Sequence, residues 1–317
     1  PQLVNAADLL EGGARGDLDP LAGATGFELL GVGDAGNALR GIRTPRNFYS
    51  ESSIASTFLQ TTWNMADTFR MTLGGRLTWE NKEASRNLNF ALDDGSIQPI
   101  GEVDTAAAVS FAAERHDLKG EREELQFAPS INFQWDATDE LMAYFTASKG
   151  FKSGGFDARS NSSPSADPTP INPNAPTGTN QQVLIGSFEF EEEEALSYEL
   201  GFKSTLLDGA AELNDAIFRT EFDNLQVSVF DGTLGFNVGN AASAISQGIE
   251  LDGRMALTEN LMLAGGLAFL DFEFQDHKFG TCVQDQIPDN PNGINCDYSG
   301  KTNQYVADYS GNLLLSY

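Results

Sequence analysis

The chain has 317 residues, and 46 acidic against 19 basic residues give it a formal net charge of −27. Nucleic acid is excluded as a partner class, because phosphate polymers are bound by Lys and Arg that displace counterions. The hydrophobic fraction of 40% is enough for a buried core, which argues against disorder of the whole chain.

A helical membrane protein is also excluded. The longest nearly apolar run, Leu261 to Leu270, is about half of what a membrane-spanning helix needs. The chain begins at Pro1 without the charged start and short apolar run of a signal peptide. We therefore expect either a removed signal or an internal piece of a longer protein.

Nine segments of about ten residues alternate between apolar and polar side chains, which predicts β-strands with one apolar face. In chain order they lie at Leu59–Trp63, Phe69–Trp79, Leu125–Trp135, Leu141–Ala147, Ser197–Lys203, Leu213–Phe222, Ile245–Met255, Leu261–Phe269 and Ala307–Tyr317. The segment Leu213–Phe222 has apolar residues at both parities, which predicts a bulge there. No amphipathic helix is evident, so the fold class is all-β.

The connections between these segments alternate in length. Short polar turns are expected at 64–68, 136–140, 207–210 and 258–260, and long acidic connections at Asn81–Glu124, Lys152–Glu194, Asn224–Ala242 and Gln275–Gln304. Such long loops are uncommon in compact soluble domains. Outer-membrane barrels combine short periplasmic turns with long extracellular loops, and aromatic residues near their strand ends form girdles at the membrane surfaces. The candidates for these girdles are Trp63, Trp79, Trp135, Tyr144 and Tyr317.

Several stretches resemble the β-barrel of TonB-dependent outer-membrane receptors. They are Leu73–Glu80, Tyr144–Phe156, Tyr198–Lys203, Phe218–Gln226 with Asn240-Ala241, and Gly248–Leu251. The likeness runs in consistent order from Ser50 to Tyr317. It implies an antiparallel transmembrane β-barrel of 22 strands with a plugged lumen, of which this chain would supply about nine.

The resemblance also predicts what this chain lacks. No part of it matches the family's plug domain or the segment that engages TonB. Nine strands would leave two open edges, which cannot face lipid because unpaired backbone groups are costly there. We therefore expect residues 1–49 to be an extracellular loop region and residues 50–317 to be the middle portion of a receptor barrel.

The function implied by the resemblance is active transport across the bacterial outer membrane, not enzymatic catalysis. The imported ligand would be a ferric siderophore or other metal chelate, and TonB would drive import through the plug. Ligand contacts are expected in the segments 81–124, 152–194 and 275–304. Candidates for lumen-facing plug contacts are Arg70, Arg76, Glu80, Glu199, Lys203, Glu250, Asp252 and Arg254.

Two alternatives stay open from the residues alone. One is a passive porin or adhesion barrel without energy coupling. The other is a soluble secreted β-protein, for example one that binds carbohydrate, in which the alternating faces pack two sheets together. A plug domain in the full-length protein would exclude the first, and partition into detergent would exclude the second.

Local motifs add few further sites. Cys282 and Cys296 lie in a polar segment and predict a disulfide in an oxidising compartment, with free thiols as the alternative. The acidic run Glu189 and Glu191–Glu194 could bind Ca²⁺, although such runs are commonly a solvated surface.

Three other features favour a structural interpretation. Gly31–Gly36 has dinucleotide-binding spacing without the surrounding strand and helix, and is interpreted as a loop. His116 and His277 fit no catalytic or zinc pattern and are expected in loops. The basic, glycine-rich stretch Lys149–Phe156 is interpreted as a place where a strand leaves the membrane, not as a ligand site.

Overall fold

The computed structural model describes residues 42–92, 94–99, 101, 113–161, 188–230, 236–278, 280–283, 286–289 and 295–317. The regular elements of this part of the chain are β-strands apart from one 3-10 turn, η1 (Leu207–Gly209). Nine strands form its main sheet: β2 (Arg46–Ala66), β3 (Phe69–Leu88), β5 (His116–Asp136), β6 (Leu141–Lys152), β9 (Glu193–Leu206), β10 (Ala211–Phe230), β11 (Phe236–Thr258), β12 (Leu261–Asp276) and β15 (Tyr309–Ser316). None of the described helical segments is long and apolar enough to cross a membrane.

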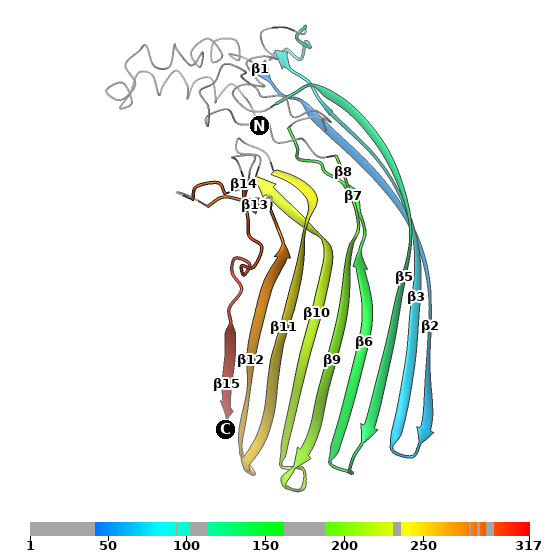
Figure 1. The fold of residues 1–317 in the computed structure, drawn as a ribbon, viewed down its shortest axis with the longest axis vertical. Helices are drawn as coiled ribbons and strands as arrows, with labels where there is room; N and C mark the ends of the chain where they lie inside the picture. The colour runs from blue at the N-terminus through cyan, green and yellow to red at the C-terminus, as the bar shows by residue number, and fades with distance from the viewer. Residues whose placement is uncertain are drawn as a thin grey trace, which may run out of the picture.

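The main sheet is an antiparallel meander. Its strand order is β15-β12-β11-β10-β9-β6-β5-β3-β2, so each of these strands pairs with the next one along the chain. The sheet curves like the wall of a barrel, with short turns at one end and long connections at the other (Figure 1). We call these the turn end and the loop end. The predicted nine-stranded partial barrel is thus confirmed, and so are its four short turns.

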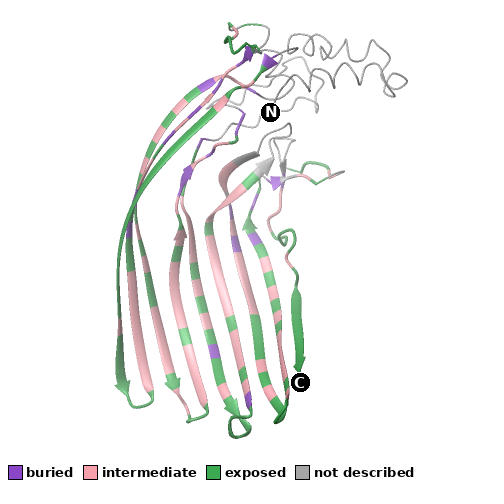
Figure 2. Cartoon of the chain, turned by 180° about the vertical axis from the view of Figure 1, so that it is seen from behind, coloured by how far each residue is buried: buried purple, intermediate pink, exposed green. Residues whose placement is uncertain are grey.

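Short strands gather at the loop end. They form three two-stranded sheets, made by β1 (Ile42–Arg43) with β4 (Ala91–Leu92), β7 (Gly155–Phe156) with β8 (Glu189–Phe190), and β13 (Gly280–Thr281) with β14 (Asn295–Cys296). Figure 2 shows buried residues concentrated toward this end of the sheet. The larger apolar ones are Ile42, Leu88, Phe90, Phe188 and Phe274. The core therefore lies where connections fold back onto the sheet, not along its whole length.

Strand pairing assigns side chains to faces, because directly opposite residues share a face of the sheet. One row across the sheet contains Met71, Phe133, Phe145, Leu200, Ile217, Ile249 and Phe269. The neighbouring row contains Arg70, Gln134, Tyr144, Gly201, Ala216 and Glu250. The sheet thus has an apolar face and a polar face, as the alternation predicts.

The apolar side chains of the apolar face form a band, which we call the apolar band, and this band crosses the strands obliquely. The row that contains Phe269 of β12 meets β3 at Met71. On β3 the apolar side chains nevertheless continue to Trp79, and on the neighbouring β5 they extend to Leu125. A band that changes register steadily from strand to strand means that the strands are tilted to it, as closure of a barrel requires.

Several strands are longer than the sequence predicts. The strands β2, β3 and β5 have 21, 20 and 21 residues, so much of the expected connection Asn81–Glu124 is strand. The prediction of a long connection at Asn224–Ala242 is also wrong, because β10 and β11 stay paired as far as Phe230 and Phe236. Beyond the apolar band the outward side chains of β3 and β5 are polar, so apolar alternation no longer marks the strand there.

The bulge predicted in Leu213–Phe222 lies just beyond that segment. Pairing of β10 with β11 is continuous from Ala211 to Phe222, and the register shifts between Phe222 and Gln226. Asn224 sits in this irregularity with a φ of 58°, a left-handed conformation that Asn tolerates better than most residues. The mixed parity upstream reflects Ala216 and Phe218 on the polar face, not a change of register.

Candidate ligand-binding site at the loop end

The eight residues predicted to face the lumen all lie on the polar face. Strand pairing places Arg70, Arg76 and Glu80 there from β3, Glu199 and Lys203 from β9, and Glu250, Asp252 and Arg254 from β11. They do not converge on one point but bind neighbours on adjacent strands. Examples are Arg70 with Asp136 at 2.8 Å, Glu199 with the Tyr144 hydroxyl at 2.6 Å, and Arg254 with Glu212 at 2.6 Å. Their contact with a plug stays a prediction.

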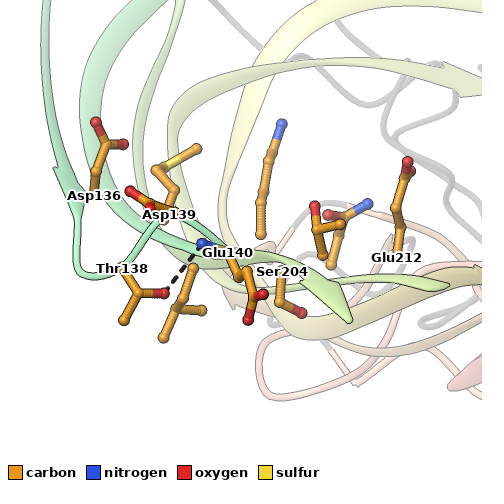
Figure 3. Close-up of a pocket in the computed structure, with 11 residues that line it drawn as sticks. Asp136, Thr138, Asp139, Glu140, Ser204 and Glu212 are labelled. Atoms are coloured by element: carbon orange, nitrogen blue, oxygen red, sulfur yellow. Dashed lines mark hydrogen bonds between the residues drawn. The ribbon is translucent and has the colours of Figure 1, made fainter. Parts of the chain in front are cut away.

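A hollow of about 510 Å³ opens on the polar face at the turn end. Asp136 ends β5, Thr138, Asp139 and Glu140 come from the β5–β6 turn, and Ser204 and Glu212 come from β9 and β10 (Figure 3). The backbone N–H of Glu140 donates a hydrogen bond to Thr138 Oγ1 at 3.1 Å, which shapes this turn. Four carboxylates with Lys203 make the hollow acidic, so it suits a polar or cationic surface better than an apolar ligand.

A second pocket, of about 640 Å³, lies at the loop end. We call it the loop-end pocket. It combines aromatic, aliphatic and polar side chains from four strands and from the segment before β15. Its lining is Lys152, Glu193, Leu225, Gln226, Val227, Ser228, Phe274, His277, Gly280, Tyr298, Thr302, Asn303, Gln304 and Tyr305. A concave site of this size with apolar walls and a few polar groups is typical of small-molecule binding.

Side-chain amides fix the backbone beside the loop-end pocket. Gln226 Nε2 donates hydrogen bonds to the carbonyl oxygens of Ser153 at 3.0 Å and Glu191 at 2.9 Å. Asn240 Nδ2 donates to the carbonyl oxygens of Glu191 and Asn224, both at 2.9 Å. These amides satisfy backbone groups where β9 begins and β10 bulges. No spacing in the sequence marks this role, although Gln226 and Asn240 belong to the stretches that carry the family resemblance.

A disulfide-closed connection supplies His277, Gly280 and Tyr298 to the pocket lining. Cys282 and Cys296 form a disulfide with a Cα–Cα distance of 5.1 Å. The imidazole of His277 lies between the rings of Phe274 and Tyr298, with centroid distances of 4.8 and 5.7 Å. The backbone N–H of Tyr298 also donates to the carbonyl oxygen of His277 at 2.8 Å. These contacts hold the connection against the end of β12.

A buried charged cluster ties the β6–β9 connection to β3 and β5. Arg86 Nε donates to His116 Nε2 at 3.1 Å, and Arg86 Nη1 donates to the carbonyl oxygen of Asp157 at 2.7 Å. Because Arg86 can only donate, Nε2 of His116 must accept, and His116 Nδ1 must donate to the carbonyl oxygen of Glu114 at 2.9 Å.

Burial sets the charge states in this cluster. Burial, and then the charge of Arg86, lowers the pKa of His116 from 6.5 to about 4. Burial likewise lowers the pKa of Arg86 to about 10, against the opposing effect of Asp157. His116 therefore stays neutral at pH 7. The expectation that His116 lies in a loop is wrong, because it is the buried first residue of β5.

Arg122 of β5 contacts the predicted acidic run at Glu189 and Glu192. It forms ion pairs with Glu124, with Glu189 at 3.1 Å, and with Glu192. Gly154 packs so closely that a side chain there would lie 2.5 Å from Arg122 Nε, which supports the structural interpretation of Lys149–Phe156. The described residues contain no group of three His, Cys, Asp or Glu arranged to hold a metal ion. Calcium binding by the acidic run stays a prediction, and Gly31–Gly36 lies outside the described residues.

Comparison with known proteins identifies the family. The family model for the TonB-dependent receptor-like β-barrel matches residues 7–317. A probable TonB-dependent siderophore receptor, PiuA of Acinetobacter baumannii, is 31% identical over 124 residues, which is 38% of this chain and 16% of that protein. The metal-pseudopaline receptor CntO of Pseudomonas aeruginosa is 28% identical over 157 residues, which is 50% of this chain and 18% of that protein.

Solved structures show the same fold. The ferric yersiniabactin uptake receptor FyuA of Yersinia pestis matches with a TM-score of 0.54 and 16% identity, over 86% of this chain and 32% of that one. The PiuA structure from A. baumannii matches with a TM-score of 0.53 and 19% identity, over 85% of this chain and 32% of that one. The present chain thus spans about a third of the length of these structures. It belongs to the TonB-dependent receptor β-barrel family, whose members are transport receptors of the Gram-negative outer membrane.

Proposed function

We propose that this chain is the barrel portion of a receptor that binds a ferric siderophore or other metal chelate outside the cell and imports it. The loop-end pocket carries this proposal. Its volume of about 640 Å³ and its mixed apolar and polar lining suit a ligand of chelate size.

The orientation of the sheet supports an extracellular ligand. Outer-membrane barrels place short turns on the periplasmic side and long loops outside. The loop end of this sheet therefore faces the medium, and a ligand arriving from outside meets the loop-end pocket first. The acidic hollow at the turn end lies on the periplasmic side.

The polar face is proposed to surround a plug domain, through which TonB would supply energy. It carries charged side chains of both signs along β3 and β11, and Arg70 and Arg254 form ion pairs across strands with Asp136 and Glu212. Such a face can exchange hydrogen bonds with a second polar surface without a large desolvation cost. We assign this receptor no covalent chemistry: binding, gating and release are sufficient for transport.

The names of the relatives support a metal chelate over other cargo. PiuA is named as a siderophore receptor and CntO as a receptor for metal-pseudopaline. Both identities cover only part of this chain, so the particular chelate is not carried over. The class that the two names share is a metal ion held by a small organic chelator.

The proposal is tested by uptake in the organism that encodes the chain. Iron-starved cells would receive radioactive ferric iron bound to the chelators of their own culture medium. We expect deletion of the gene to remove a saturable part of the uptake, and deletion of TonB to remove the same part. Reintroducing the gene should restore it. Unchanged uptake of this iron, and of the other metal chelates in the medium, would contradict the proposal.

A further inference from the structure

We infer that Tyr305 is a ligand-binding residue at the mouth of the loop-end pocket, and that its ring stacks on a planar aromatic group of the bound chelate. This inference rests on the proposed function, because it assigns a ligand chemistry to the same site. Three observations carry it: the place of Tyr305 in the pocket, the exposure of its ring, and the conformation of its backbone.

Tyr305 lies in a short bridge between two anchored points. The backbone N–H of Phe274 donates to the carbonyl oxygen of Lys301 at 3.0 Å, and that of Leu270 donates to Asp308 at 2.8 Å. Both anchors attach the segment to β12. The residues between them include Thr302, Asn303, Gln304 and Tyr305, which line the pocket. The bridge is thus held at the pocket from both sides.

Tyr305 is fully exposed, at 102% of its reference area, although it lines the pocket. Tyr298, the other tyrosine of the pocket, is packed against His277, lies under the Lys301 ammonium at 5.4 Å, and donates its hydroxyl to Gln286 at 3.1 Å. A large ring left in water beside an apolar pocket gains free energy when another apolar surface covers it.

The backbone of Tyr305 has a φ of 61°, in the left-handed region. This conformation is uncommon for a residue with a bulky side chain, because Cβ approaches the backbone. The other described non-glycine residues with positive φ, Leu207, Asp208 and Asn224, lie in the tight turn after β9 and at the β10 bulge. Strained residues in connections cluster at ligand clamps, where the position of the side chain compensates for the strain.

The surroundings of Tyr305 define the chemistry of the ligand. Leu225, Val227 and Phe274 supply apolar surface, and Gln226, Asn303 and Gln304 supply amide groups. The ammonium of Lys152 and the carboxylate of Glu193 lie 3.9 Å apart in the same lining. The charges of Lys152 and Glu193 balance, and the rest of the lining includes aromatic, aliphatic and amide groups. Such a lining suits a flat aryl group that carries hydrogen-bonding oxygens. Offset stacking on a tyrosine ring favours such a group over an aliphatic one.

The test compares two ferric chelates that differ in aromatic character. The full-length receptor with its plug, purified in detergent, is titrated with ferric catecholate and with ferric acetohydroxamate. We expect Tyr305→Ala to weaken binding of ferric catecholate by about tenfold, as loss of one aromatic stack does, and to leave ferric acetohydroxamate unchanged. Tyr305→Phe should bind both like the wild type. Tyr49→Ala is the matched control, because Tyr49 is 61% exposed on β2 and lies outside the pocket.

A glycine variant separates the ring from its backbone. Tyr305→Gly accepts the left-handed conformation without strain, so it should unfold at no lower temperature than the wild type while binding ferric catecholate as weakly as the alanine variant. Equal losses for both chelates in Tyr305→Ala would overturn the inference and place the ring against the plug. Unchanged binding of ferric catecholate by Tyr305→Ala would also overturn the inference.

The wild-type titrations distinguish this inference from the proposed function. Binding of ferric acetohydroxamate without ferric catecholate would overturn the aromatic assignment and keep the chelate receptor. Binding of neither chelate, together with unchanged iron uptake in the deletion strain, would overturn both.

Discussion

Two arginines of the polar face form carboxylate pairs in very different surroundings. The Arg122 side chain is 14% exposed and contacts three carboxylates, whereas Arg254 is 62% exposed and contacts Glu212. Removing one partner of a buried network leaves charges unpaired away from water, and exposed pairs contribute little. We expect Arg122→Met to destabilise the loop end by about 2 kcal/mol, measured as faster hydrogen exchange in β8 and at the start of β9.

Arg254→Met provides the matched control for this prediction. It removes two charge-assisted hydrogen bonds to Glu212, at 2.8 and 2.6 Å, but both side chains remain in water. Hydrogen exchange of β10 and β11 should therefore stay close to that of the wild type. Equal losses of hydrogen-exchange protection in Arg122→Met and Arg254→Met would mean that burial does not account for the effect of removing Arg122.

His116 makes the loop end sensitive to acid. Its pKa is about 4 in the folded protein and near 6.5 when the chain is unfolded, so between these values the unfolded state binds more protons. Stability must then fall as the pH is lowered through this window, and His116 adds no further change below it. The loss amounts to about 3 kcal/mol at most. We expect hydrogen-exchange protection near Asp157 to drop between pH 6.5 and 4.

A glutamine at position 116 should remove this dependence. Its amide can donate to the Glu114 carbonyl or accept from Arg86, but it does not titrate. The variant is expected to lose some stability at pH 7 and to show a flatter profile from pH 6.5 to 4. A profile as steep as that of the wild type would mean that other groups cause the acid sensitivity.

At the scale of elements, the extended hairpin β2–β3 and its neighbour β5 carry an unfavourable row of charge. Glu51 is directly opposite Glu83, which is directly opposite Glu121. Like charges in direct cross-strand pairs are destabilising. We expect Glu83→Gln to stabilise this extension by a few tenths of a kcal/mol. Hydrogen exchange of β3 is measured for the variant and the wild type at low and at high salt. Salt should reduce the difference in protection between the two proteins. A difference that salt does not alter would argue against charge repulsion as its cause.

The disulfide-closed connection should depend on its bond for order. Cys282 and Cys296 are 14 residues apart, and closing a loop of this length removes about 3 kcal/mol of chain entropy from the opened state. We expect the double variant Cys282→Ser with Cys296→Ser to increase hydrogen exchange around Tyr298 while β2 and β3 stay protected. Unchanged exchange at Tyr298 would mean that ring packing with His277 is sufficient.

The strands were predictable where one face meets lipid and the other does not. Phe69–Trp79 and Leu125–Trp135 alternate cleanly because they cross the apolar band. Beyond it, residues such as Glu83 and Lys119 face water, and no periodic signal remains to mark the strand. In the last part of β3, Leu88 and Arg86 are buried, and the Arg86 guanidinium lies over the ring of the distant Phe188.

The loop-end pocket could be predicted only in part. The connections 152–194 and 275–304 were expected to hold ligand contacts, and the pocket lies partly between their ends. Gln226 contacts Ser153 and Glu191, Arg122 contacts Glu189 and Glu192, and His116 contacts Arg86. No local spacing in the sequence encodes these long-range contacts. Buried polar residues resemble solvated loop residues in a sequence, because burial is created by segments that are far apart along the chain.

For the whole molecule, the central prediction concerns which face of the sheet meets the plug. Glu250 pairs with Ala216 and Ala268 on the polar face, and the adjacent Leu251 pairs with Leu267 on the apolar face. A cysteine at position 250 should react with a charged thiol reagent when the plug has been deleted, and much more slowly in the full-length receptor. A cysteine at position 251 should stay unreactive in both, because lipid covers it.

Within this chain no native thiol competes with the introduced cysteine, because its two cysteines are joined in a disulfide. Equal reactivity of the cysteine at position 250 with and without the plug would mean that this part of the polar face borders open water. The charged rows on β3, β9 and β11 would then line a solvent-filled passage, and selectivity would depend on the loop-end pocket alone. Protection by the plug would instead mean that a ligand held at the loop-end pocket passes only when the plug moves, which is what an energised receptor requires.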